Sequence, residues 1–220
     1  AVGAARAVVD PGYRYFDGLI DEFAIYDTVL DAGAILIHYT AGVSDPPSSS
    51  VPIPGLFSTG IGEDGELLGG SGAIDPHYEL IESPDNDANG PDAVTLNPGF
   101  PVGPWIEEGP GSRWIAPEAA QNIGSAPGQY TYRTKFNLSG FDLATVRIVG
   151  RWASDNGGTD ILINEEGSFN SAPSFTDWSD FEITEGFVSG ENTLDFVLSN
   201  AGDAANPTGV RVEILETSGD

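Results

Sequence analysis

The chain has 220 residues, of which 34 are Asp or Glu and only 8 are Lys or Arg, so its formal net charge at neutral pH is −26. This charge argues against binding to nucleic acids or to anionic membrane surfaces, because both need cationic contacts. Cysteine is absent, which excludes disulfides and thiolate metal sites, and the 2 histidines are too few for a multi-histidine metal centre. No apolar run reaches the roughly 18–20 residues of a membrane helix, so we expect no membrane insertion.

The acidic side chains are accompanied by a single lysine, Lys135. Carboxylates without lysines give a strongly hydrated, self-repelling surface. Such a surface suits an extracellular or cell-surface protein in a salty medium, or one that binds divalent cations; simple solubility explains it equally well.

Residues 1–43 predict one strand and one helix. The pattern over Leu19–Tyr26 is typical of a strand, and Asp31 is a good N-cap for a helix that runs to Tyr39 and is closed by Gly42. One strand and one helix bury too little apolar surface to fold alone. We therefore expect this piece to pack on the rest of its own chain or to complete a sheet in another copy, unless it is the end of a larger domain.

The same piece resembles a known family. The segment 16–26 reads FDGLIDEFAIY, and Leu30 and His38-Tyr39 follow it. This pattern, over about 13–42, resembles the C-terminal strand and closing helix of a laminin-G-like, concanavalin A-like sandwich. The resemblance implies that the rest of that sandwich is not part of this sequence.

A linker separates this piece from the remainder. Residues 44–54 read SDPPSSSVPIP, which is rich in proline and serine and has no pattern that could bury a face. The domain organisation expected from the sequence is therefore a strand and helix at 1–43, a linker at 44–54 and a main domain at 55–218.

The main domain shows the alternation of apolar and polar residues that is typical of β-strands. Short strands separated by glycine and proline, with no credible long helix, predict an all-β fold, a β-sandwich or jelly roll. The clearest strands are Tyr130–Leu138, Val146–Trp152, Ile161–Ile163, Leu194–Leu198 and Val210–Ile214, and weaker ones are Tyr78–Ile81, Val94–Leu96, Trp114–Ile115 and Phe181–Ile183.

The order of these segments resembles the galactose-binding-like jelly roll of bacterial surface proteins. The resemblance covers roughly 130–216 and depends on Asp155-Asn156, on Ile163-Asn164 and on the GENTL segment at 190–194. Glu165 stands where that pattern has glycine. The resemblance implies the fold, and it leaves the function open because this fold serves many functions.

One acidic loop is a candidate calcium site. Residues 85–90 read DNDANG, with oxygen ligands at the first, third and fifth positions and glycine at the sixth, as at the start of a calcium loop. Leu96 stands at the twelfth position in place of a bidentate Glu, so the loop is no EF-hand. A looser Ca²⁺ site and a solvated acidic turn both remain open. The candidate ligands are Asp85, Asp87, Asn89 and Asp92.

The sequence contains no convincing catalytic constellation, so we expect no enzyme activity. Residues 60–65 match G-x-G-x-x-G, but without a flanking strand and helix, and with two carboxylates that would repel phosphate, a turn is the better interpretation. Adjacent carboxylates on turns rarely reach the separation that glycoside hydrolysis needs. His77 is interpreted as a packing residue at a strand edge.

Three tryptophans lie in loops rich in proline, glycine, serine or acidic residues, whereas Trp152 lies in a predicted strand. Exposed aromatic faces stack on sugars, while neighbouring charged groups bind hydroxyls. Burial of these rings as plugs under the loops is the alternative. The candidate glycan-binding residues are Trp105, Arg113, Trp114, Asp177 and Trp178.

Together these observations favour a non-catalytic extracellular module that recognises a glycan or polysaccharide and serves adhesion within a larger bacterial surface or matrix protein. An accessory domain of a hydrolase would look the same in sequence. The alternative is a structural subunit of a fibre or sheath, which assembles with copies of itself by strand exchange through the N-terminal segment.

Overall fold

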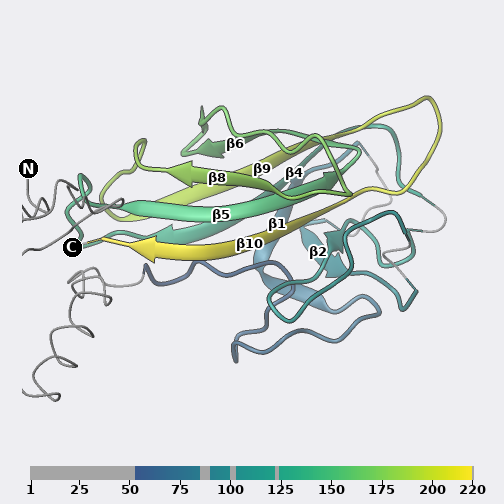
Figure 1. Cartoon of the computed structure of the whole chain (residues 1–220), viewed down its shortest axis with the longest axis horizontal. Helices are drawn as coiled ribbons and strands as arrows, with labels where there is room; N and C mark the ends of the chain where they lie inside the picture. The colour runs from purple at the N-terminus through teal and green to yellow at the C-terminus, as the bar shows by residue number, and fades with distance from the viewer. Residues whose placement is uncertain (1–52, 85–89, 100–102, 122–123, 220) are drawn as a thin grey trace, which may run out of the picture. The chain divides into compact units, whose positions relative to one another are not determined.

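The computed structural model of the protein describes residues 53–84, 90–99, 103–121 and 124–219 (Figure 1). The chain divides into two compact units, residues 1–48 and 49–220, and all described residues belong to the second. The strand and helix expected within residues 1–43, most of the 44–54 linker and three candidate calcium ligands lie outside the described residues.

All regular structure in the described residues is β-structure, so the predicted all-β class is confirmed for this unit. None of these residues forms a helix that could cross a membrane. The strands are β1 (Ile74–Glu82), β2 (Asp92–Thr95), β3 (Ile115–Ala116), β4 (Gly128–Asn137), β5 (Arg147–Asp155), β6 (Gly157–Ile163), β7 (Glu166–Gly167), β8 (Ser179–Ile183), β9 (Glu191–Asn200) and β10 (Gly209–Ser218).

The strands form one curled antiparallel sheet in the order β7-β6-β9-β4-β1-β2-β3-β10-β5-β8. Two long pairings fix its halves: β4 pairs with β9 from Gly128↔Asn200 to Asn137↔Glu191, and β5 pairs with β10. The short strands β2 and β3 connect the halves, and Figure 1 shows β8, β5 and β10 in a layer in front of β9 and β4. This is the arrangement of a β-sandwich.

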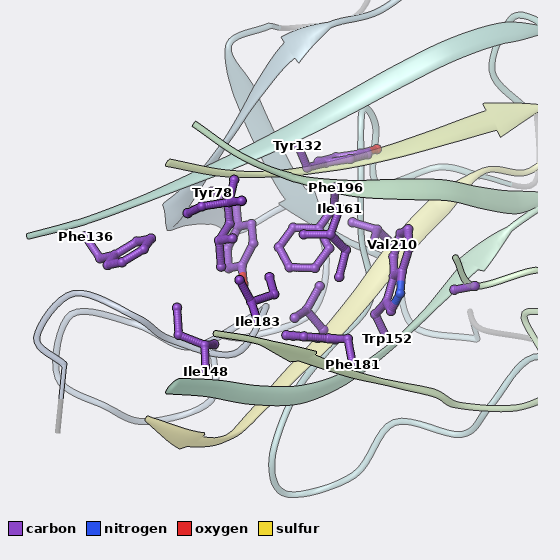
Figure 2. Packing of buried hydrophobic residues seen from close by; sticks show 14 of the residues in the cluster. Tyr78, Tyr132, Phe136, Ile148, Trp152, Ile161, Phe181, Ile183, Phe196 and Val210 are labelled. Atoms are coloured by element: carbon purple, nitrogen blue, oxygen red, sulfur yellow. The ribbon is translucent and has the colours of Figure 1, made fainter. Parts of the chain in front are cut away.

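The core lies between the two layers. Alternation decides which side chains enter it: in β5, Ile148 and Trp152 point inward and are fully buried, whereas Arg147 and Arg151 lie on the opposite face. Trp152 packs edge-to-face on Phe196 of β9, with ring centroids 5.5 Å apart (Figure 2). The inner faces expected from the sequence are therefore confirmed for these strands.

Two motifs behave as the sequence predicts. Residues 60–65 form a turn in which Gly65 N–H donates to the Gly62 carbonyl at 2.9 Å, so they hold no nucleotide-binding strand and helix. The His77 ring stacks on Phe57 at a centroid distance of 3.8 Å, as a packing residue does.

Candidate functional site

A second apolar cluster lies on the outer face of β5 and β10, beneath the loop that precedes β3. Trp114 is 0% exposed and Trp105 is 7% exposed, and their ring centroids are 4.5 Å apart. The Trp114 indole N–H donates to the Ile106 carbonyl at 2.9 Å. The expectation that these two rings present faces to a sugar is therefore wrong; they are buried plugs that fix the loop to the sheet.

The other three candidate residues lie around the same cluster. Arg113 forms an ion pair with Glu108 at 2.5 Å. Asp177 is exposed, and its carboxylate accepts a hydrogen bond from the Thr176 hydroxyl at 2.6 Å. Trp178 is half-buried and packs against the cluster.

A network of charged side chains, in which Arg211 and Glu213 are buried, holds the loop and Trp178 in place. The Arg211 guanidinium donates to the Ser112 hydroxyl and to the Glu107 carbonyl, each at 2.6 Å, and it lies 4.8 Å from the centre of the Trp178 ring. Arg151 binds Glu213 at 2.7 Å and lies 4.6 Å from the same ring centre. Burial lowers the pKa of the Arg211 guanidinium, while Glu213 opposes that effect. These contacts hold the loop against β5 and β10, so the cluster has a structural role.

A different aromatic side chain is exposed. Phe169, just after β7, is 96% exposed and has a φ of 61°. A bulky residue at positive φ is an outlier that costs roughly 1–3 kcal/mol and is typically retained at binding sites. Sequence reasoning missed Phe169, because an isolated aromatic in a polar segment is also typical of a buried loop plug.

The residues on both sides of Phe169 are tied to β6. Ser168 donates from its backbone N–H and its hydroxyl to the Ile161 carbonyl, at 3.0 and 2.6 Å. The backbone N–H of Asn170 donates to the Asp160 carboxylate at 2.9 Å. Phe169 is therefore held out into solvent by fixed neighbours.

Beside Phe169 lies a pocket of about 250 Å³ between the β6–β7 hairpin and the segment that follows β8. Ile163 and Ile183 supply apolar surface. Its polar lining consists of hydroxyl groups and carboxylates: Ser168, Thr184, Glu166, Glu182 and Glu185.

The wall of this pocket is preorganised by tight packing and side-chain amides. Gly186 has a φ of 86°, and a Cβ there would lie 2.5 Å from the Ile163 side chain, so only glycine fits. The Asn164 amide donates to the Gly186 carbonyl at 2.9 Å and to the Asn192 side chain at 2.8 Å. Asn164 and Asn192 stand out in the sequence as marks of a jelly roll, and the structure adds that they support this pocket.

The hairpin that carries the pocket turns through Asn164 and Glu165, which have φ values of 50° and 74°. Positive φ at both central residues is what the type I′ turn of a two-residue hairpin requires, and this turn favours Asn-Gly. Glu165 therefore occupies a position where glycine would be relaxed.

The calcium hypothesis stays a prediction. Of its candidate ligands only Asp92, half-buried at the start of β2, is described. Within the described ranges no three His, Asp or Glu side chains are grouped so that they could hold a metal ion.

Comparisons with known proteins add little to this geometry. No protein family and no curated protein matches the sequence. Among solved structures, the chain is similar to a family 35 carbohydrate-binding module from Clostridium thermocellum, with a TM-score of 0.31 and 15% identity over 55% of this chain and 85% of that one. So distant a likeness says nothing of function, which must be argued from the site. Fold and site together define a β-sandwich module with a preorganised pocket beside an exposed aromatic ring.

Proposed function

We propose that the described unit is a non-catalytic glycan-recognition module of an extracellular or cell-surface protein, and that it binds through Phe169 and the adjacent pocket. The observation that carries the proposal is an aromatic ring that is 96% exposed, held at positive φ, beside a preformed pocket. Burying a Phe side chain is worth roughly 1.5–3 kcal/mol. A ligand that covers the ring would recover this free energy.

The binding mode follows from the lining. The apolar face of a sugar ring stacks on Phe169, and its hydroxyl groups donate to the carboxylates of Glu166 and Glu185. The pocket volume of about 250 Å³ lies below the roughly 300–1,000 Å³ of sites for drug-sized ligands, so it suits one sugar unit of a glycan. The fixed wall limits the ordering cost of binding.

A glycan array with the wild-type protein and Phe169→Ala tests the proposal. Binding should be present in the wild-type protein and lost in the variant. Leu215→Ala is the matched control, because Leu215 is also an exposed apolar residue, at 56%, and it lies outside the pocket. Full binding by Phe169→Ala, or no binding by the wild-type protein to any glycan, would contradict the proposal.

The fibre hypothesis remains an alternative proposal that depends on residues 1–43, which lie outside the described residues. Light scattering on the preparation used for the array separates the two. Binding by monomers favours the module, whereas large polymers without glycan binding favour the fibre.

A further inference from the structure

We infer that the pocket beside Phe169 selects sugars that carry a free amino group, as in a deacetylated amino-sugar polymer. The inference rests on the proposed function and adds the chemical class of the ligand. It depends on the charges that line the pocket and on the ion pairs of the surrounding surface.

Three glutamates line the pocket, and two of them have no charged partner among the described residues. Glu166 and Glu185 form no ion pair with any described residue, whereas Glu182 is bound by Arg147 at 2.6 Å. Arg147 is itself shared with Glu216 at 3.0 Å, so its charge is divided between two carboxylates. A ligand in this pocket therefore meets excess negative charge beside an aromatic ring.

Within the part of the chain that the structure describes, an acidic sugar finds no unpaired cation. Every lysine and arginine among the described residues is already in an ion pair with a carboxylate. The chain as a whole has a net charge of −26, which repels anions at longer range. A uronate or a sulfated sugar would lose its hydration without gaining a partner, so the site rejects both.

An amino sugar fits the same groups. An ammonium group has three N–H donors, and its hydrogen bonds to carboxylates are charge-assisted and stronger than those of a hydroxyl group. It also compensates the negative charge of Glu166 and Glu185, which form no ion pair with a described residue. The face of Phe169 attracts a cation through its ring quadrupole while it packs on the apolar face of the sugar. An N-acetylated sugar keeps the stacking and loses the charge.

General attraction between a polycation and an acidic protein is the competing explanation, and it makes a different prediction. Attraction to the whole surface depends on net charge, so it does not change when Phe169 is replaced, and neutralising any two carboxylates weakens it equally. Binding in the pocket depends on Phe169, Glu166 and Glu185 in particular. Matched variants therefore separate the two.

The experiment is calorimetry at physiological salt with a glucosamine hexamer and its fully N-acetylated counterpart. We expect the free-amine hexamer to bind at least tenfold more tightly to the wild-type protein. Phe169→Ala should weaken its binding at least tenfold, and the pair Glu166→Gln and Glu185→Gln should remove the preference. The control pair is Glu63→Gln and Asp64→Asn, two exposed carboxylates outside the pocket, which removes the same charge and should keep the preference.

Each outcome is distinguishable. Equal or tighter binding of the N-acetylated hexamer, still dependent on Phe169, overturns the amino-sugar inference and leaves the glycan site standing. Equal loss in the pocket pair and the control pair, with no dependence on Phe169, overturns the inference in favour of attraction to the whole surface. If neither hexamer binds while another glycan on the array does, the amino-sugar inference is overturned and the proposed function stands. If no glycan binds at all, both are overturned. Melting curves establish that every variant is folded.

Discussion

The buried tryptophan cluster and the exposed Phe169 pocket make opposite use of aromatic residues in loops. In the first, Trp114 is 0% exposed beneath a loop fixed by Arg211. In the second, Phe169 stands in solvent because Ser168 and Asn170 are tied to β6. The comparison teaches that a polar, glycine-rich context does not reveal whether an aromatic side chain closes a loop or binds a ligand. The contacts of its neighbours decide.

The largest expected effect is a contrast in stability between the two aromatic residues. Trp114→Ala should lower the free energy of unfolding by about 3–5 kcal/mol, because it empties a fully buried site. Phe169→Ala should change it by less than about 0.5 kcal/mol, because the ring is almost fully exposed. Urea denaturation of both variants measures the contrast. Similar losses of stability in the two variants would show that Phe169 contributes to the fold as much as Trp114 does.

The second prediction tests whether the buried Arg211 stabilises the loop over the tryptophan cluster. Arg211→Met removes a buried guanidinium and leaves the Ser112 hydroxyl and the Glu213 carboxylate with fewer partners. We expect a loss of about 3 kcal/mol. The control is Arg113→Met, which breaks the Arg113–Glu108 ion pair. The Arg113 side chain is more exposed than that of Arg211, so its loss should cost about 1 kcal/mol or less. Equal losses in urea denaturation would show that burial of Arg211 is not what matters.

The third prediction concerns pH. Asp155, at the end of β5, is 5% exposed, and burial raises the pKa of its carboxyl from 3.8 to about 6, against a hydrogen bond from Trp105 that lowers it. The folded state therefore holds the proton more tightly than the unfolded state. The stability contributed by the neutral carboxyl is present below about pH 4 and is lost as pH rises through about 6.

Asp155→Asn never ionises and can still accept a hydrogen bond from Trp105. It should match the wild-type protein near pH 4 and exceed it by about 2 kcal/mol above pH 7. Denaturation of both proteins across this range measures the difference, and subtraction cancels the effect of the other carboxylates. A difference that does not change with pH would argue against the raised pKa.

The smallest expected effect lies in the hairpin of the pocket. Glu165→Gly keeps the positive φ but removes the steric strain that a Cβ causes there. It should raise the free energy of unfolding by about 0.5–1 kcal/mol, after the entropic cost of glycine is subtracted. Asn164→Gly keeps the relaxed backbone but removes the amide that binds Gly186. It should therefore destabilise the protein and weaken glycan binding. A stabilised Asn164→Gly variant would contradict the role given to that amide.

The sequence by itself determined the class of fold. Alternation placed Tyr130 and Tyr132 on one face of β4, and Ile148 and Trp152 on one face of β5, because side chains of a strand alternate between its two faces whatever surrounds it. The turn at 60–65 was also predictable, because short glycine-rich segments depend on local backbone preferences.

Only the tertiary structure decided where the site lies. Ser112 and Arg211 are 99 positions apart in the chain, yet their hydrogen bond is part of what buries the tryptophan loop. Glu166 of β7 and Glu185 after β8 line one pocket although β7 and β8 stand at opposite ends of the strand order. The curl of the sheet brings these two ends together. Strand alternation is a local property, whereas exposure of a loop residue depends on segments distant in sequence, and for that reason the pattern revealed the core and not the pocket.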